Sequence, residues 1–271
     1  MRGTPIRLSP CRRFICDLLH SARSVPTVPV QRRMHLDAVV RARSAGHERP
    51  SWAAIFTKAY ARVALAMPAL RRAYVKFPWP HLYEYPVSVA SIAVERDLGG
   101  EKAVFLGRIK QPERLSLAEL TEAIRHLQAV PIAGCKEYRR ILRVSALPRP
   151  IRRSLWWLGL NIGRQRGNYF GTFAVSVYSS LGAESLHPLS PLTTTLNYGV
   201  IAPDGDVAVR IMYDHRVMDG ATVARALGRM EEILNSVILE EVRSLANLAE
   251  TNSHLADVAT AAPKTAGPWL N

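Results

Sequence analysis

A short segment near the C-terminal end of the chain combines residue types that could move a proton. Residues 213–220 read Tyr-Asp-His-Arg-Val-Met-Asp-Gly and follow a run that alternates like a β-strand. A histidine at the end of a strand is held by rigid backbone and exchanges protons near neutral pH, so His215 is a candidate general base. Asp219 stands where a helix should begin, and there its carboxylate can accept from unpaired N–H groups or pair with a cation. Gly220 leaves room for a close approach to the backbone. On spacing alone this is weak evidence, because a surface histidine ahead of a helix is usually inert.

Hydrophobic periodicity predicts the elements that must position this segment. Asp219 should open a terminal helix to about Leu234, and a second helix should follow to about Leu245. The turn at 203–206 predicts that the strands on either side of it form a hairpin. Strands are expected at 25–34, 83–94, 103–109, 172–178, 193–201 and 207–213. Helices are expected at 36–43, 52–67 and 117–127, the last two after the N-cap residues Ser51 and Ser116.

The first 25 residues allow two interpretations. They are rich in arginine and hold Asp17 as their one acid, as a mitochondrial transit peptide would. They also carry the signals of a helix, with Ser9 as N-cap, Pro10 at the first helical position and apolar residues from Phe14 to Leu19 on one face. We favour the second interpretation, a docked helix of the folded protein.

The composition is that of a globular protein with an unusual charge. Apolar residues make up 48% of the 271 residues and charged residues 21%, which excludes wholesale disorder, collagen and a coiled-coil rod. No apolar run reaches the roughly 18 residues of a membrane span. Cys11, Cys16 and Cys135 are too scattered for a disulfide framework, and no cysteine–histidine cluster has zinc spacing, so we expect a metal-free protein in a reducing compartment. The formal net charge is +14, which favours polyanionic partners such as nucleic acid, anionic lipid or coenzyme A.

Residues 213–220 resemble the His-x-x-x-Asp-Gly signature of the chloramphenicol acetyltransferase-like superfamily. The form Asp-His-Arg-x-x-Asp-Gly is typical of its 2-oxoacid dehydrogenase acyltransferases, and further motifs of that family follow in order over about residues 6–240. Residues 8–26 look like the family's opening helix, and 52–67 like the helix after its first strand. Residues 93–99 with 115–117 are similar to its strand, Gly-Leu turn and Ser-Leu helix start. Residues 171–176 look like its Gly-Thr-Phe-Thr-Ile-Ser strand.

The resemblance implies an α+β fold, in which a mixed sheet of the chloramphenicol acetyltransferase-like kind is flanked by helices and the protomers form trimers. We expect one acyltransferase catalytic domain over residues 1–246, with a basic, tryptophan-containing insertion near 135–167, and a mobile C-terminal tail over 247–271. Active sites of this family lie between neighbouring protomers of a homotrimer. His215 and Ser176 therefore need not meet within one chain.

The resemblance also implies a role for each site residue. His215 would take the proton from a thiol, hydroxyl or amine acceptor. Ser176 would donate a hydrogen bond to the oxyanion of the tetrahedral intermediate. Asp219 would be structural and pair with a buried arginine, for which Arg12 is the candidate by position. Gly220 would support the turn.

These roles predict a free-standing acyltransferase that moves an acyl group between a coenzyme A-type thioester and an unidentified acceptor. Acyl-CoA is expected as substrate, without a metal. The chain is expected to hold no lipoyl domain and no lipoyl-lysine, so a lipoyl or acyl-carrier partner would act in trans. The alternative is a non-catalytic trimeric scaffold subunit, against which the intact His215, Ser176 and Asp219 argue. A nucleic-acid-binding protein is disfavoured, because no binding motif or aromatic stacking platform is present.

Two stretches depart from the family pattern near Ser176. Residues 177–180 read Val-Tyr-Ser-Ser where the family has a single asparagine, and residues 193–195 are threonines where it is rich in glutamine and alanine. We therefore expect a reshaped loop beside Ser176 and an altered acceptor. Among the other histidines, His187 is the hardest to dismiss, because it follows the strand of Ser176 closely.

The segment near 135–167 is the largest departure. Its basic residues are Lys136, Arg139, Arg140, Arg143, Arg149, Arg152, Arg153, Arg164 and Arg166, against one acid, Glu137. Two helical pieces broken at Pro148 and Pro150 are expected here. Residues 151–163, which include Trp156 and Trp157, could lie on an anionic membrane or line an acyl channel. The alternative is a helix that packs on its own trimer or on another subunit. We expect a cytoplasmic protein, with membrane association through 151–163 or a mitochondrial location as the alternatives.

Overall fold

The computed structural model describes residues 1–46 and 48–247, so the predicted tail lies, apart from Asn247, outside the described residues. The helices and strands are α1 (Pro10–Ala22), β1 (Thr27–His35), α2 (Asp37–Ala45), α3 (Trp52–Ala66), η1 (Pro68–Arg71), β2 (Arg72–Val75), β3 (His81–Glu84), β4 (Val89–Leu98), β5 (Glu101–Lys110), α4 (Leu117–Ala129), α5 (Lys136–Ala146), α6 (Arg149–Asn161), α7 (Gly163–Tyr169), β6 (Phe173–Val175), η2 (Ser179–Leu181), β7 (Thr194–Tyr198), β8 (Asp206–Asp214), α8 (Gly220–Ile233) and η3 (Leu234–Ile238).

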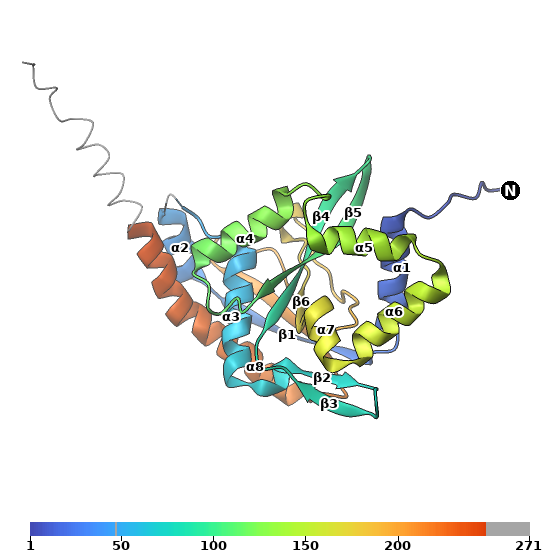
Figure 1. Ribbon diagram of the computed structural model, residues 1–271. Coiled ribbons are helices and arrows are strands. Elements are labelled where there is room, and N and C mark those ends of the chain that lie inside the picture. The colour runs from blue at the N-terminus through green and yellow to red at the C-terminus, as the bar shows by residue number, and fades with distance from the viewer. Residues whose placement is uncertain (47, 248–271) are drawn as a thin grey trace, which may run out of the picture.

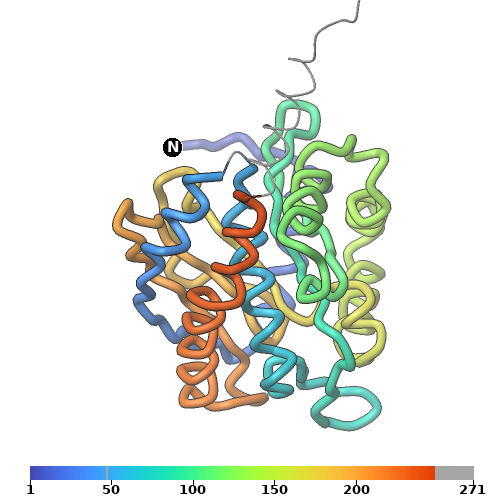
Figure 2. The backbone as a smooth tube through the Cα atoms, turned by 90° about the vertical axis from the view of Figure 1, so that its left-hand side faces the viewer, coloured from blue at the N-terminus to red at the C-terminus, as the bar shows by residue number. Residues whose placement is uncertain are grey.

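A six-stranded mixed sheet in the order β1-β8-β7-β6-β4-β5 forms the centre of the molecule, and β2 pairs with β3 in a separate two-stranded sheet. The strand β6 runs parallel to both β4 and β7, while the remaining pairs of the large sheet are antiparallel. In Figure 1, α2, α3, α4 and α8 lie on one side, and α1, α5, α6 and α7 gather on the other. Figure 2 shows α3 alongside α8 on the first of these sides, where the two helices pack together.

The predicted hairpin before His215 is confirmed. Its strands β7 and β8 pair antiparallel, with Leu196 opposite Ile211. The turn requires Gly205, which has a φ of +83°, and a Cβ atom there would lie 2.2 Å from the backbone nitrogen of Asp37. Because β8 lies between β1 and β7, its far end carries His215 on backbone that is paired on both sides.

The predicted helix starts are also confirmed. The side chain of Ser51 accepts a hydrogen bond from the N–H of Ala54 at the start of α3, and Ser116 forms a capping box with Glu119 at the start of α4. Ser9 accepts from the N–H of Arg12 at the start of α1. The N-terminal segment therefore forms the expected helix.

The structure corrects three predicted boundaries. The single strand expected at 83–94 is two strands, β3 and β4, which belong to different sheets. The basic segment forms three helices, α5, α6 and α7: Pro150 lies in the first turn of α6, where its missing N–H costs no hydrogen bond, and a further break at Ile162, whose backbone is extended, separates α6 from α7. The two helices expected after Asp219 are one continuous helical segment to Asn247, in which η3 is a π-helical turn.

The main core lies between the sheet and the α2–α3–α4–α8 side. Phe56 and Tyr60 of α3 are fully buried, and their rings lie 4.2 and 4.3 Å from those of Tyr198 and Phe173. Burial raises the pKa of the Tyr60 hydroxyl well above its usual range, and this hydroxyl makes a hydrogen bond of 2.6 Å with Thr194. A separate small cluster forms around Phe14, Trp156 and Leu160. No helix of the described residues is long and apolar enough to cross a membrane.

Candidate functional site

The turn that carries His215 is held in place by a buried carboxylate. Asp214, the last residue of β8, has no exposed surface, and its Oδ1 accepts from the N–H of Arg216 at 3.0 Å. Both carboxylate oxygens also accept from the Arg216 guanidinium, at 2.9 and 2.7 Å. The N–H of His215 donates to the carbonyl of Pro26 at 3.1 Å. The guanidinium of Arg216 lies 4.3 Å from the centre of the Tyr74 ring. The backbone around His215 is therefore fixed from several directions.

The imidazole of His215 lies at the surface of the protomer. Its side chain is 51% exposed, and Nδ1 is 3.9 Å from Oδ1 of Asp219. The Tyr213 ring lies 5.5 Å from the imidazole. The carbonyl of Asp219 accepts from the N–H of Thr222 to begin α8, but its side chain caps nothing and is 84% exposed. The Asp219 carboxylate therefore lies beside the imidazole, at a distance longer than a hydrogen bond.

Gly220 lies against Tyr213. A Cβ atom on Gly220 would lie 3.2 Å from the Tyr213 hydroxyl oxygen. Burial, together with the negative charge of Asp219, raises the pKa of Tyr213, so its hydroxyl stays protonated at neutral pH. The close approach that the sequence predicts for Gly220 is thus an approach to a tyrosine hydroxyl beside the histidine.

The predicted pair between Asp219 and Arg12 is wrong. Arg12 is largely exposed, and its Nε donates to Glu101 at the start of β5, at 3.1 Å. The reason is the direction of α1: Arg12 lies in its first turn, whereas its last turn leads to Pro26 beside His215. About 15 Å of helix separates Arg12 from Ala22, the last residue of α1. The buried arginine–aspartate contact of α1 involves Asp17 instead, which pairs with Arg152 of α6 at 2.7 Å.

Ser176 lies level with the middle of β8, whereas His215 lies just beyond the C-terminal end of that strand. Ser176 directly follows β6, where its N–H donates to Leu196 at 3.1 Å and its carbonyl accepts from the Asn197 side chain at 2.6 Å. Through the register of β6, β7 and β8, Ser176 is level with Arg210, and His215 lies five residues further along β8. At about 3.4 Å per residue, this is roughly 17 Å along the strand. The two side chains do not meet within one protomer.

The long loop after Ser176 is tied to the sheet by an ion pair that the sequence analysis missed. Glu184 accepts from Arg210 at 2.7 Å, and the Arg210 side chain is only 8% exposed. The hydrogen bond from Arg210 holds the pKa of Glu184 below its usual range. Gly199 makes room for this carboxylate, since a Cβ atom there would lie 2.1 Å from Oε1 of Glu184. The sequence did contain a signal of this pair, because Arg210 is a charged residue among the apolar residues of a predicted strand. The same loop brings His187 to the Thr27 hydroxyl, at 2.8 Å, next to the turn of His215.

A basic groove of about 940 Å³ adjoins the turn at Arg216. No aspartate or glutamate is among the residues that line it, whereas its basic lining residues are His20, Arg23, Lys76, Arg153, Arg166 and Arg216. Arg166 is buried and donates to the carbonyls of Tyr74 and Pro191, so its role is structural. Arg23 and Lys76 have no acidic partner in the described part of the chain, and they can bind an anion. In residues 1–46 and 48–247, no three His, Cys, Asp or Glu side chains gather as a metal site requires.

Solved structures with a similar fold include dihydrolipoamide acetyltransferases and the core of a 2-oxoacid dehydrogenase complex. A probable dihydrolipoamide acetyltransferase from Listeria monocytogenes is 19% identical, with 90% of this chain and 96% of that chain covered and a TM-score of 0.61. The cubic core of the pyruvate dehydrogenase multienzyme complex is 17% identical, with 87% and 93% covered and a TM-score of 0.60. The dihydrolipoamide acetyltransferase of Azotobacter vinelandii, in which a serine, a histidine and an asparagine have been investigated for their roles in catalysis, is 15% identical, with 87% and 93% covered and a TM-score of 0.61.

These similarities establish the fold of the chain. It is the α+β fold of the 2-oxoacid dehydrogenase acyltransferase cores, and the fold class predicted from the sequence is confirmed. No family model matches the sequence, and a comparison with curated proteins finds no match.

Proposed function

We propose that this protein is an acyltransferase that moves an acyl group from a coenzyme A-type thioester to a thiol, hydroxyl or amine acceptor. The observation that carries the proposal is the half-exposed His215, held on a rigid turn with the Asp219 carboxylate 3.9 Å from its Nδ1. An imidazole that can both accept and return a proton, and that remains open to a second molecule, is what acyl transfer requires.

The spacing of the acetyltransferase from Azotobacter vinelandii supports these roles. The histidine and the asparagine investigated for its catalytic mechanism are four residues apart. His215 and Asp219 have the same spacing in this chain. Asp219 would take the position of that asparagine and orient the imidazole from the start of α8.

In the proposed reaction, His215 removes the proton from the acceptor as it attacks the thioester carbonyl. The tetrahedral intermediate carries its negative charge on the former carbonyl oxygen, to which Ser176 donates a hydrogen bond. The intermediate then expels the coenzyme A thiolate, which takes the proton back from His215. Protons and charge balance, and no metal takes part.

The active site would form between protomers. Within one sheet, His215 lies about five residues along β8 from the level of Ser176, so a site that uses both requires His215 of one chain and Ser176 of its neighbour. A homotrimer closes such head-to-tail contacts into a ring. The basic groove beside Arg216 supports a phosphate-bearing substrate such as acyl-CoA, and a lipoyl or acyl-carrier protein would supply the acceptor in trans.

The proposal is tested by measuring thiol release from a panel of acyl-CoA thioesters in the presence of thiol, hydroxyl and amine acceptors. His215→Ala should lower the rate about 10²- to 10⁴-fold, because a general base is lost. Ser176→Ala should lower it by about 10²- to 10³-fold, because a donor to the oxyanion is lost. His126→Ala, which removes an exposed histidine of α4, is the matched control and should leave the rate unchanged.

The second candidate function is the non-catalytic scaffold. It is favoured if the wild-type protein and His215→Ala both show background rates across the whole panel while forming the same oligomer.

A further inference from the structure

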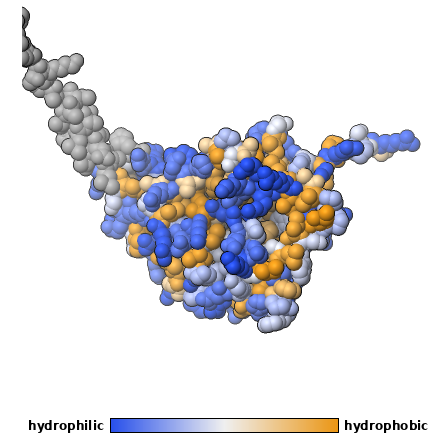
Figure 3. Space-filling model, in the orientation of Figure 1, coloured by the Kyte–Doolittle hydropathy of each residue, from blue (hydrophilic) through white to orange (hydrophobic). Residues whose placement is uncertain are grey.

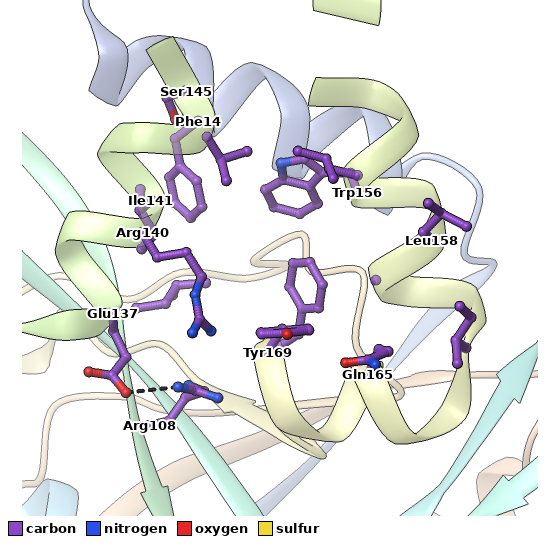
Figure 4. Close-up of a pocket in the computed structure, with 16 residues that line it drawn as sticks. Phe14, Arg108, Glu137, Arg140, Ile141, Ser145, Trp156, Leu158, Gln165 and Tyr169 are labelled. Carbon is purple, nitrogen blue, oxygen red and sulfur yellow. Dashed lines mark hydrogen bonds and ion pairs between the residues drawn. The ribbon is translucent and has the colours of Figure 1, made fainter. Parts of the chain in front are cut away.

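A cavity of about 470 Å³ lies within the basic insertion, away from His215 and Ser176. Its walls are formed by α1, α5, α6, α7 and β5, and Figure 4 shows side chains from these elements that point into it. The volume is within the range of about 300–1,000 Å³ that is usual for small-molecule sites. We name it the insertion pocket.

The floor of the insertion pocket is aromatic and rigid. Trp156 is 5% exposed and lies between two phenylalanines, with its ring 5.7 Å from Phe14 and 5.0 Å from Phe170. Gly159 allows Phe170 to approach α6, since a Cβ atom there would lie 2.8 Å from that ring. Buried ion pairs hold α6 in place, because Asp17 of α1 contacts both Arg152 and Arg153. The pocket is therefore a preformed feature of the fold.

The rim of the insertion pocket is apolar and exposed. Leu155 and Leu158 of α6 are 43% and 45% exposed, and both line the pocket. Figure 3 shows hydrophobic side chains gathered over α6 at the right of the view, beside a strongly hydrophilic region. An apolar surface that leads into an apolar cavity marks a binding site for an apolar ligand.

The polar end of the pocket carries an excess of positive charge. Arg108 and Arg140 reach the same side of the pocket (Figure 4), and Glu137 accepts from Arg108 at 2.7 Å. Burial would raise the pKa of Glu137, but hydrogen bonds from its own backbone and from Arg108 hold it below the usual range, so Glu137 is ionised at neutral pH. Arg140 lies 4.6 Å from the centre of the Tyr169 ring and has no carboxylate partner among the described residues. One positive charge at this end is left without a counter-charge.

We propose that the insertion pocket binds a single long aliphatic chain with an anionic head group. The chain lies along Trp156 and the floor, and the head group accepts hydrogen bonds from Arg140. The carboxylate of a fatty acid and the phosphates of an acyl-CoA thioester both have this chemistry. This pocket is separate from the proposed active site between protomers, because His215, Ser176 and Asp219 are not among the residues that line it.

The test uses 11-bromoundecanoate, whose bromine quenches tryptophan fluorescence on contact. Trp156 lines the insertion pocket, whereas its neighbour Trp157 lines the basic groove on the other face of α6. Saturable quenching is expected in the wild type and in Trp157→Phe, and most of it should be lost in Trp156→Phe. Quenching that survives in Trp156→Phe and is lost in Trp157→Phe would overturn the proposal.

Affinity measurements test the head group. Arg140→Gln should weaken binding of 11-bromoundecanoate by about tenfold or more, because a charge-assisted hydrogen bond is lost. Arg139→Gln makes the same change at a residue of α5 that does not line the pocket and should bind as the wild type does. Equal affinities of the two variants, or equally tight binding of dodecyltrimethylammonium, would contradict the assignment. Circular dichroism and melting curves identify any variant that fails to fold.

Competition experiments identify which kind of ligand supplies the aliphatic chain, a free fatty acid or an acyl-CoA thioester. Displacement of the probe by dodecanoate points to a free carboxylate, and displacement by dodecanoyl-CoA points to an acyl thioester; either supports the pocket, and failure of both overturns it. Vesicles of brominated phosphatidylglycerol test the membrane alternative. Quenching by these vesicles, without saturable binding of the free probe, would instead assign α6 to a membrane surface.

Discussion

At the residue scale, the shape of the candidate site depends on Asp214 more than on the residues that would carry out the chemistry. Its buried carboxylate accepts three hydrogen bonds from the backbone and guanidinium of Arg216. These bonds fix the turn that presents His215. Asp219, by contrast, is exposed in the protomer and is free to meet another molecule.

Replacement of Asp214 by Asn should therefore destabilise the folded protein. The variant keeps the shape of the side chain but leaves the Arg216 guanidinium without its counter-charge, which should lower the free energy of unfolding by about 2–4 kcal/mol. Asp37→Asn is the matched control, because Asp37 forms an exposed i,i+4 pair with Arg41 and such pairs contribute about 0–1 kcal/mol. Urea unfolding of both variants measures the difference, and similar midpoints would refute a special role for Asp214.

At the element scale, the loop between β6 and β7 depends on Glu184 and Arg210. The folded-state pKa of Glu184 is lowered by its hydrogen bond with Arg210. The pair therefore stabilises the fold fully above the ordinary carboxyl pKa of about 4.3, and this stability is lost as the pH falls through the lowered value.

Glu184→Gln should reduce the stability of the protein at pH 7 by about 1 kcal/mol, a value discounted because the Glu184 side chain is 34% exposed. The gap between the melting temperatures of wild type and variant should stay constant down to about pH 5 and close below about pH 4. Glu95→Gln, which alters an exposed pair with Lys102 at 3.6 Å, should show no such dependence. A gap that widened at low pH would mean that the sign of the linkage is wrong.

The elements that the sequence predicts well are those specified by neighbouring residues. The N-caps at Ser9, Ser51 and Ser116 are local signals, since donor and acceptor lie within three residues of each other. The division between β3 and β4 was missed because apolar alternation continues through residues 85–88. Pro86, which has no N–H to donate to a sheet, was the signal of that break.

Contacts between distant elements could not be predicted in the same way. Arg12 has its partner 89 residues away in Glu101, and this pair forms because α1 packs against β5 at the edge of the sheet. The insertion pocket is a similar case. The sequence places Trp156 on an apolar face of a basic helix, but the cavity arises from the packing of α5, α6 and α7 against α1 and β5.

At the scale of the whole molecule, the proposed roles of His215 and Ser176 require another chain to complete the site. A protomer that worked alone would require the two side chains within about 6 Å, so that both could contact one acyl group. The sheet register separates them by roughly 17 Å. In the proposed homotrimer, a neighbouring chain would supply the missing partner.

Mixed oligomers test this arrangement directly. His215→Ala and Ser176→Ala should each be inactive alone. When the two variants are co-expressed with different affinity tags and the mixed trimers are purified, some interfaces will combine the intact serine of one variant with the intact histidine of the other. A purified mixed trimer holds two subunits of one variant and one of the other, so one of its three interfaces carries both wild-type residues, and the activity should return to about a third of the wild-type value. A mixture of the separately assembled variants is the control and should stay inactive until the subunits exchange. If the mixed trimers have no more activity than this control, each site must lie within one chain, and the register of β6, β7 and β8 then leaves His215 without Ser176 as its partner.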